Sequence, residues 1–548
     1  MTDRMMEGAG MGGAMDDVPQ AGGRGLTRRG FVAASAGMTL AAGVAALAGG
    51  AGGLVAPRPA HAAGTSFRYG TTGYGPINDD AGLNPHENYS GWSCLRYGVG
   101  ETLFRFTDGM EPEPWLADSY EFIDDNAAVR IKVRDGVTFS SGRALDGQAV
   151  KECLDDLVAA HDRAPGDLRI DHIDAEGQIV TIHTREPNPA LVNYLCDPYS
   201  CIIDMQQGVS ADRNVAGTGP YKAVFVSDDE IRLIRNESYW GGAPQVDDVT
   251  VTQITDGDTL TFSLQSGDVQ ACYGLPYASY ALFADPARFA VSSCETSRVF
   301  FAQMNYDSPV TSDAAVRRAI AMGIDKEGFV STLLNGRGKA ATGPFPRNLA
   351  LGVERVVAPD YDPEGAKRVL EEAGWVDGDG DGVREKDGQK LTIRWLTYPS
   401  RQELPLLAES AQASLRAIGM DVQVNSTASH TDVRKDPTAW DVYASALVTA
   451  PTGDPSYFFT ATCTSTATKN FGHYASDELD DLAHQLDEEF DVEKRVDLAV
   501  RMQQTILDDD AFVFVSHLTM GIVSTTDVSG MTAHPCDYYE ITADLRVG

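Results

Sequence analysis

Short segments in which apolar and polar residues alternate recur along the chain. The segments AAVRIKVRDGVTF (127–139) and GQIVTIHTREP (177–187) alternate in this way and end at turn residues. Such alternation predicts strands that are buried on one face. Between these segments the period changes to three or four, which is typical of helices that lie against a sheet.

Helix signals accompany the second period. The segment DGQAVKECLDDLVAAH (146–161) opens with Asp146, a preferred N-cap residue. In DPEGAKRVLEEAGW (362–375), Asp362 is the predicted cap, Pro363 suits the first helical turn, and Gly374 ends the helix. A helix followed by a strand is predicted over 402–425. The pattern indicates an α/β fold with helix-covered sheets, and the absence of a Pro- or Ser-rich linker favours lobes joined by strands.

Composition and charge limit the class of protein. The chain has 548 residues, 43% of them hydrophobic and 22% charged, as in a folded protein larger than one ordinary domain. Its formal net charge is -35, which argues against nucleic acid as a partner because phosphate binding requires a positive field.

The N-terminal region, 1–62, reads as a twin-arginine export signal. Arg28 and Arg29 precede an apolar run rich in Ala and Gly, and Ala60 and Ala62 form a small-x-small cleavage site. That boundary contains no Cys, so a lipid anchor is not indicated. Beyond residue 63 no apolar run approaches the roughly 20 residues of a membrane span. We therefore expect a soluble mature chain that works in the periplasm or at the outer face of the cell membrane.

Catalytic and redox motifs are missing from the sequence. It has no G-x-S-x-G elbow, no H-E-x-x-H helix and no C-x-x-C pair. Among the eight cysteines, Cys196 and Cys201 are closest to each other, and a disulfide or buried free thiols fit equally well. His534 and Cys536 could hold a metal, although ordinary structure is the more frequent role of one such pair.

An Asp-rich segment, WVDGDGDGVREKDG (375–388), has a cation-binding pattern. Asp377, Asp379 and Asp381 stand at alternate positions, like the first ligands of an EF-hand loop, with the carbonyl of Val383 beside them. Gly388 occupies the position of the closing Glu. Asp and Gly also form turns without any metal. A structural calcium and a plain surface turn both remain open, and no cofactor is required.

Several ordered segments resemble one family, the extracytoplasmic solute-binding proteins of ABC transporters (family 5, the peptide and nickel group). They include IKVRDGVTFSSGRALDGQAV, AGTGPYKAVF, IRNESYWGGAPQVDDVTV, MNYDSPVTSDAAVRRAIAMGIDKEGFV and YDPEGAKRVLEEAGW. The resemblance covers 66–548. It implies a two-lobed periplasmic-binding-protein-like fold (type II) with hinge strands and a ligand cleft between the lobes.

The resemblance also implies the limits of the lobes and a role. Lobe I would comprise 63–299 and 516–548, and lobe II 300–515, with crossovers near Phe300 and Val515. A monomer would capture a solute in the cleft, close by hinge bending, and deliver it to permease subunits with their ATPases. It would not be an enzyme. The alternative is an exported hydrolase or calcium-dependent enzyme with the same acidic character.

The ligand class stays open between a short peptide and a nickel-type metal chelate. Peptide-binding members typically carry an Asp that pairs with the peptide's ammonium group, and Pro451 stands at the matching place unless Asp454 substitutes. Arg clamps carboxylates and aromatic faces support flat ligands. On this basis the predicted ligand-binding residues are Trp92, Arg96, Tyr97, Arg163, Tyr398, Arg401, Asp454 and Tyr457. His86, His430 and His473 are weaker candidates for metal contacts.

Overall fold

The computed structural model describes residues 65–72 and 82–548, and residues 65–548 form one compact unit. The predicted export signal, 1–62, lies outside the described residues. Among the helices of the described ranges, none has the length and apolar character needed to cross a membrane.

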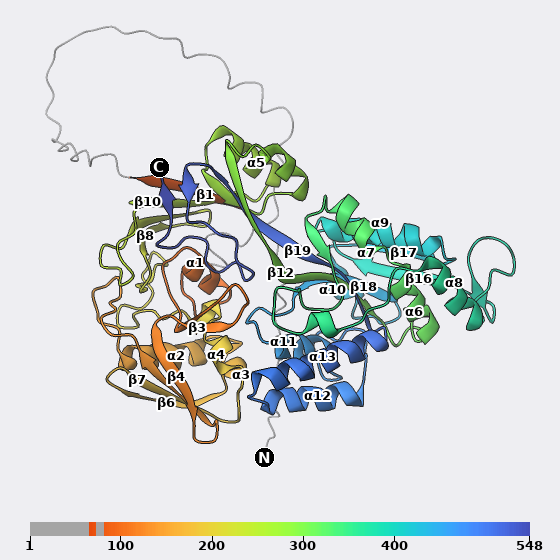
Figure 1. The fold of residues 1–548 in the computed structure, drawn as a ribbon, viewed down its shortest axis with the longest axis horizontal. Coiled ribbons are helices and arrows are strands. Elements are labelled where there is room, and N and C mark those ends of the chain that lie inside the picture. Colours follow the sequence, from red (N-terminus) through yellow and green to blue (C-terminus); the bar gives the residue numbers. More distant parts are fainter. Residues whose placement is uncertain (1–64, 73–81) are drawn as a thin grey trace, which may run out of the picture. The chain divides into compact units, whose positions relative to one another are not determined.

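One sheet of eleven strands runs through both lobes (Figure 1). Its order is β17 (Asp421–Ser426), β16 (Thr392–Thr397), β18 (Val442–Val448), β12 (Phe289–Met304), β19 (Phe512–Thr525), β11 (Ala271–Tyr273), β1 (Ser66–Thr71), β10 (Asp248–Gln253), β9 (Glu230–Arg235) and β8 (Tyr221–Val226), while β13 (Gly338–Ala340) pairs with β19. The strands of lobe I lie at one end of this order and those of lobe II at the other.

Two long antiparallel strands, β12 and β19, connect the lobes. Phe289 to Glu295 of β12 pairs with the second half of β19 in lobe I, and Val299 to Gln303 pairs with the first half in lobe II. The register shifts between Glu295 and Val299, where a bulge or irregularity bends paired strands. This change of pairing lies close to the crossover predicted near Phe300. The exact limits of the lobes stay a prediction.

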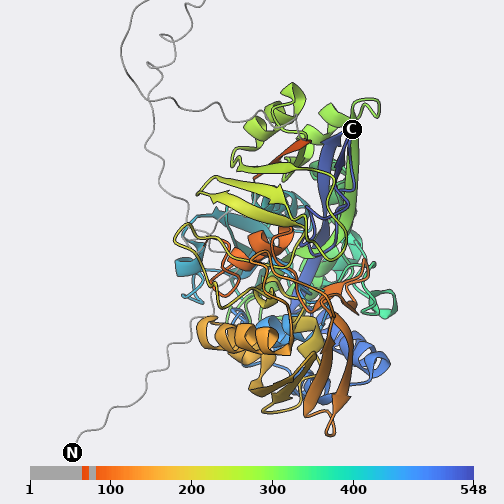
Figure 2. The ribbon, with the colours of Figure 1, turned by 90° about the vertical axis from the view of Figure 1, so that its left-hand side faces the viewer.

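A second sheet belongs to lobe I alone (Figure 2). Its order is β4 (Ala117–Ile123), β5 (Ala128–Val133), β7 (Ile179–Thr184) and β6 (Ile170–Glu176), and α2 (Gly147–Ala160) packs against β6 and β7. The alternating segments at 127–139 and 177–187 contain β5 and β7, which confirms both predicted strands.

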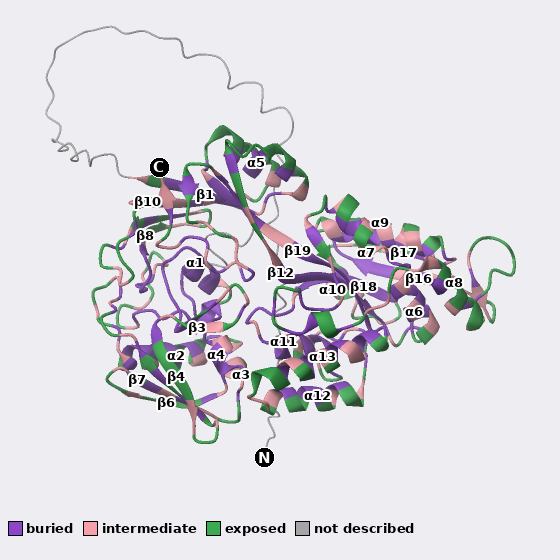
Figure 3. Cartoon of the chain, viewed as in Figure 1, coloured by how far each residue is buried: buried purple, intermediate pink, exposed green. Residues whose placement is uncertain are grey.

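Lobe II surrounds its part of the large sheet with helices whose outer faces are exposed (Figure 3). These are α6 (Ala314–Gly323), α8 (Pro363–Glu372), α9 (Glu403–Arg416), α12 (Asp477–Glu488) and α13 (Val492–Asp508). Trp395, Trp440 and Phe300 are fully buried in its core. The predicted caps are confirmed: Asp146 accepts a hydrogen bond from the Ala149 backbone N–H, and Asp362 accepts one from Gly365.

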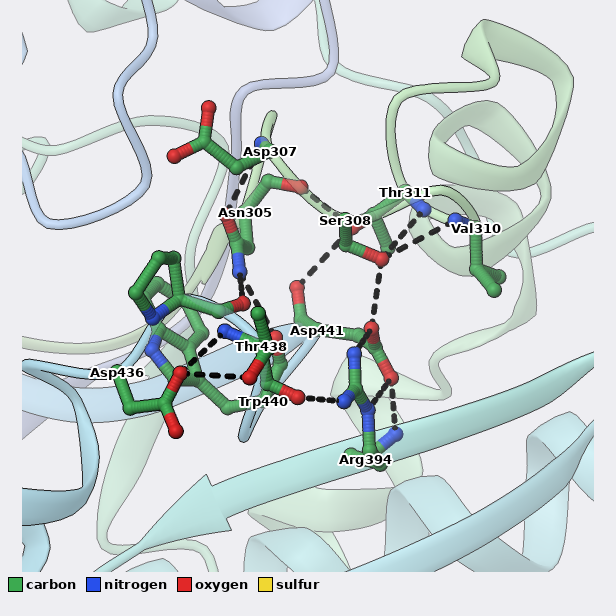
Figure 4. Close-up of polar contacts among 11 residues, drawn as sticks. Asn305, Asp307, Ser308, Val310, Thr311, Arg394, Asp436, Thr438, Trp440 and Asp441 are labelled. Carbon is green, nitrogen blue, oxygen red and sulfur yellow. Dashed lines mark hydrogen bonds and ion pairs between the residues drawn. The ribbon is translucent and has the colours of Figure 1, made fainter.

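A buried carboxylate fixes the lobe II end of β12 to its neighbours (Figure 4). Asp441 is fully buried and accepts hydrogen bonds from the Ser308 hydroxyl at 2.6 Å and from the Arg394 backbone N–H at 2.6 Å. The Arg394 guanidinium binds both of its oxygens, at 2.5 and 2.9 Å. Asn305 donates to the carbonyl of Trp440 at 2.8 Å. These bonds hold β16, the start of β18 and the loop after β12 together.

Candidate functional site

A cavity of about 170 Å³ lies where the lobes meet beside β12 and β19. Its wall combines residues of both lobes with residues of the connecting strands. Tyr273 comes from β11, Arg298 from β12, Met520 from β19, and Asp537 from the C-terminal segment, while Arg401 and Glu403 come from lobe II. The site is therefore assembled from parts of the chain that are far apart in the sequence.

Charged groups of both signs lie on this wall, and the carboxylate of Asp537 already has partners. One oxygen of Asp537 lies 2.9 Å from Nη2 of Arg96, and the other accepts a hydrogen bond from the Tyr273 hydroxyl at 3.0 Å. Arg298 and Arg401 add two guanidinium groups, and Glu403 adds a carboxylate. Such a wall suits a ligand that carries a carboxylate.

A narrow crevice adjoins the cavity and brings Trp92 of lobe I opposite Pro451 of lobe II. The Trp92 ring packs edge-on against Tyr538, with 5.1 Å between ring centroids, and the Arg96 guanidinium lies 5.3 Å from the Trp92 centroid. Tyr538 donates a hydrogen bond to the carbonyl of Pro451 at 3.0 Å, which joins the two lobes directly. Trp92 thus lies where the two lobes meet, and its contact with a ligand stays a prediction.

Beneath the cavity, Arg96 organises a buried polar cluster. Its Nε lies 3.4 Å from a carboxylate oxygen of Glu540, whose other oxygen accepts a hydrogen bond from Tyr69 at 2.6 Å. Burial raises the pKa of Glu540 to about 7. Tyr97 is completely buried beside this cluster, and burial raises the pKa of its hydroxyl. Arg96 therefore anchors the C-terminal segment that carries Asp537.

The lobes also touch at the rim farther from β12 and β19. Arg169 of lobe I binds Asp487 of lobe II through two bonds of 2.9 and 2.6 Å. Gly453 of lobe II approaches the carbonyl of Met110 so closely that an added Cβ would lie 2.0 Å from that oxygen. Gly453 also has φ +71°, so a side chain at this position is excluded twice. The structure thus shows the two lobes in contact.

An open groove of about 510 Å³ lies at the same rim, between 166–194 of lobe I and 456–487 of lobe II. Arg169 and Asp487 line it, together with Asp167. Arg163 stands near this rim, bound to Asp167 at 3.0 Å and Asp197 at 3.2 Å. Its guanidinium is thus neutralised by two acids of its own lobe.

The predicted ligand-binding residues do not form a single site. Trp92 and Arg401 line the cavity and its crevice. Tyr398 lies in the lobe II core, stacked on His430 with 4.2 Å between the ring centroids. Tyr457 lies beside Lys469, whose Nζ is 5.8 Å from the centroid of the tyrosine ring.

Asp454, the predicted substitute for an ammonium partner, is bound within lobe II. Its carboxylate accepts a hydrogen bond from the Ser456 backbone N–H at 2.9 Å and forms an ion pair with Arg495 at 2.5 Å. The side chain is 5% exposed. A ligand ammonium group would have to displace Arg495, so the geometry does not favour that role.

Sequence reasoning missed Arg298, Met520, Tyr273 and Asp537. Asp537 stands in AHPCDYYE, in which His534 and Cys536 have the residue types of metal ligands. Arg298 stands one residue before Val299, where β12 resumes its pairing with β19. Its position next to the crossover predicted near Phe300 is the sequence signal that could have indicated a cleft residue.

The histidine and cysteine candidates have ordinary partners. His534 lies 2.9 Å from Sγ of Cys536 through Nδ1 and 3.1 Å from the carbonyl of Thr107 through Nε2. All eight cysteines are free thiols, and seven of them are buried, so Cys196 and Cys201 do not form the disulfide considered above.

Around the Asp-rich segment, a lysine lies among the carboxylates. Nζ of Lys390 is 2.8 Å from Asp379, 3.0 Å from Asp381 and 3.3 Å from Glu385. Asp377 accepts hydrogen bonds from two turn N–H groups, and Asp381 accepts one from Val383. Ligand oxygens of Asp377, Asp379 and Glu385 also lie close enough together to hold a metal. Calcium would compete with Lys390 here, and the calcium site stays a prediction.

Comparison with known proteins gives a consistent result. The profile of the bacterial extracellular solute-binding proteins, family 5 Middle, matches residues 111–470. The nickel-binding protein NikA of Staphylococcus aureus is 28% identical over 406 residues, which cover 73% of this chain and 79% of that protein. The glutathione-binding protein GsiB of Pectobacterium atrosepticum is 27% identical over 59% of this chain and 62% of its own length.

Solved structures share the fold. A nickel ABC transporter protein from Bacillus halodurans superposes with a TM-score of 0.76 at 28% identity, over 88% of this chain and all of that one. The oligopeptide-binding protein AppA of Bacillus subtilis, in complex with a nonapeptide, gives a TM-score of 0.69 at 20% identity, over 88% and 99%. The likeness to AppA shows the fold alone.

Proposed function

Because the chain belongs to the bacterial extracellular solute-binding proteins of family 5, we propose that it captures a small metal chelate between its lobes for an ABC importer. The members of this family bind small solutes outside the cytoplasm and work with ABC permeases. The finer claim concerns the ligand, for which the chemistry of the cavity is the guide.

The observation that carries the proposal is the charge and size of the inter-lobe cavity. Arg298 and Arg401 supply two guanidinium groups on its wall. A chelate whose organic part bears carboxylates would be bound by these guanidinium groups. At about 170 Å³ the cavity is smaller than the roughly 300–1,000 Å³ typical of small-molecule sites, so it favours a compact ligand.

Relatives support a metal chelate. Nickel-binding proteins of Staphylococcus aureus and Escherichia coli are 28% and 26% identical to this chain. One structural neighbour holds nickel with two L-histidine molecules. In this chain the Trp92 ring would support the flat side of such a chelate.

A short peptide is the second candidate, because glutathione-binding relatives are 27% identical. A peptide needs a carboxylate for its ammonium group, and Glu403 is the remaining acid on the cavity wall once Asp537 is counted as bound. Long peptides fit poorly, since several residues would exceed the space between lobes that are already in contact.

The proposal also covers the export route and the oligomeric state of the protein. We infer that residues 1–62 direct the folded chain through the twin-arginine route and that the mature protein acts as a monomer. Replacing Arg28 and Arg29 by Lys should leave the protein in the cytoplasm, as fractionation with an antibody would detect.

The experiment that tests the ligand is calorimetry of the purified protein with four probes. These are nickel with L-histidine, nickel alone, L-histidine alone, and glutathione. We expect heat from the chelate at the cleft and a clear loss, about tenfold or more, in Arg401→Gln. Arg355→Gln, which removes an exposed lobe II arginine paired with Asp497, should match the wild type.

Three results would contradict the proposal. Binding of glutathione with no binding of the chelate would establish the peptide alternative. Equal chelate affinity in Arg401→Gln and the wild type would remove the cavity from the site. Turnover of a peptide or glycoside substrate would favour the hydrolase alternative instead.

A further inference from the structure

Two histidines and an aspartate meet on the exposed face of the four-stranded sheet of lobe I. His172 of β6 and His183 of β7 are opposite each other in the antiparallel pairing. Their rings are stacked, with 4.2 Å between centroids and 5° between planes. Two imidazoles held side by side on rigid strands form a preorganised pair of nitrogen ligands.

A local irregularity in β6 creates this arrangement. Ile170 pairs with Thr184 and His172 pairs with His183, so β6 has one residue, Asp171, more than β7 at this point. Such a bulge re-aims the side chains beside it. As a result Asp171 and His172, although adjacent in the sequence, are both exposed while Ile170 is buried.

Asp171 also orients the His172 ring. Its carboxylate lies 2.8 Å from Nδ1 of His172. In the tautomer in which Nδ1 donates its proton to this carboxylate, the lone pair of the ring is on Nε2. This is the contact by which proteins fix the tautomer and the orientation of a metal-binding histidine.

The free edges of both rings converge on one further carboxylate. An oxygen of Asp174 lies 3.4 Å from Nε2 of His183 and 3.9 Å from Nε2 of His172. One ligand atom from each of the three residues lies within 4.8 Å of the others. Two atoms bound tetrahedrally to zinc at about 2.1 Å are roughly 3.4 Å apart. Small side-chain rotations would therefore bring the three ligand atoms to the spacing of a zinc site.

We propose that His172, Asp174 and His183 form a surface site for a divalent transition metal ion. Two imidazoles and one carboxylate suit Zn²⁺, Ni²⁺ or Cu²⁺ rather than Ca²⁺ or Mg²⁺, which prefer oxygen ligands alone. Water would complete the coordination, since the three residues are partly exposed. On the adjoining strand β5, Arg130 is paired with Glu121 at 2.9 Å. The acidic chain attracts cations to its surface.

This site is independent of the proposed function. It takes the free ion, whereas the cleft is proposed to take a chelate that arrives already formed. Metal found in a preparation of the protein can therefore come from the surface site or from the cleft. The two are separable through variants that touch only one of them.

The test uses the purified protein without a histidine tag, titrated with ZnCl₂ alone in a buffer that does not bind metals. We expect one ion per chain from calorimetry, and an affinity at least about tenfold weaker in His172→Gln, His183→Gln and Asp174→Asn. With Cu²⁺ as the probe, paramagnetic resonance should report two nitrogen ligands in the wild type.

His473→Asn is the matched control. His473 is also exposed and bound to a carboxylate, Asp307, at 2.5 Å, but it has no second histidine. Its φ of 54° suits Asn. Unchanged stoichiometry and affinity in the double variant His172→Gln/His183→Gln would overturn the proposal, as would an equal loss in His473→Asn. Retained chelate binding by the double variant would keep the cleft proposal separate from this outcome.

Discussion

The ion pair between Arg169 and Asp487 predicts how strongly the closed arrangement of the lobes is favoured. The pair joins lobe I to α12 of lobe II by two bonds and lies at the rim opposite β12 and β19. In Asp487→Asn the charge attraction is lost while the shape of the side chain is kept. We therefore expect the variant to open more readily and to bind its ligand less tightly.

The magnitude follows from the exposure of the two side chains. Arg169 is 23% exposed and Asp487 is 40% exposed, so solvent screens the pair and it contributes about 1 kcal/mol or less. A free energy of about 1 kcal/mol changes an equilibrium roughly fivefold. If the lobes of the free protein are mostly apart, the apparent dissociation constant rises by up to that factor in Asp487→Asn.

Two assays measure this effect. If the lobes of the free protein are instead closed for much of the time, small-angle X-ray scattering of the ligand-free protein should give a larger radius of gyration for Asp487→Asn than for the wild type. Calorimetry with the nickel and L-histidine chelate should show the weaker affinity at low salt, and the difference should shrink near 1 M salt, where the screening length falls to about 3 Å.

Asp497→Asn is the control, because Asp497 pairs with Arg355 inside lobe II at 2.7 Å. It removes an ion pair of the same type that does not cross between the lobes. The reasoning is refuted if Asp487→Asn matches the wild type in radius of gyration and affinity at low salt. It is equally refuted if Asp497→Asn produces the same change.

Four further outcomes are expected. Trp92→Ala should weaken chelate binding about tenfold or more by calorimetry, and it should cost about 3–5 kcal/mol in urea unfolding because the ring is buried. Asp441→Asn should cost about 1–3 kcal/mol in the same assay, since the buried side chain loses the charge of its hydrogen bonds to Ser308 and Arg394 while Arg394 is partly exposed, whereas the exposed Asp436→Asn should have the smaller effect. Burial lowers the pKa of His517 to about 3, so below about pH 6.5 this histidine is protonated in the unfolded chain but stays neutral in the folded chain. The free energy of unfolding should therefore fall toward acid pH by up to about 1.4 kcal/mol per pH unit. This part of the pH dependence should be missing in His517→Gln. In scanning fluorimetry, calcium should raise the melting temperature of Lys390→Gln, whereas EGTA should leave that of the wild type unchanged because Lys390 already pairs with the turn carboxylates. A wild type that EGTA destabilises would show that calcium, not Lys390, neutralises the turn.

Much of the fold could be predicted because local signals agree with the tertiary structure. The alternation in β5 and β7, the period of α2 and α8, and the caps Asp146 and Asp362 depend on side chains within a few residues of one another. Ordered family-like segments then predicted two lobes joined by strands. These features require no knowledge of which distant residues meet.

The candidate site could be predicted only in part, since its members were chosen by residue type. Arg401 lines the cavity and Trp92 the adjoining crevice, but Tyr398 packs in a core and Asp454 is bound to Arg495. Residue type tells what a side chain can bind, whereas its partner in the folded chain decides whether it is available.

The sequence by itself determined the elements, the class of fold and the acidic character of this protein, because these follow from period, composition and short-range hydrogen bonds. Only the tertiary structure decided that Arg96 meets Asp537 across 441 positions of the chain, and that Arg298 stands at the change of register in β12. It also decided, through one extra residue in β6, that two histidines share a face. Long-range pairing and strand register are set by packing of the whole chain, and no local pattern of residues specifies them.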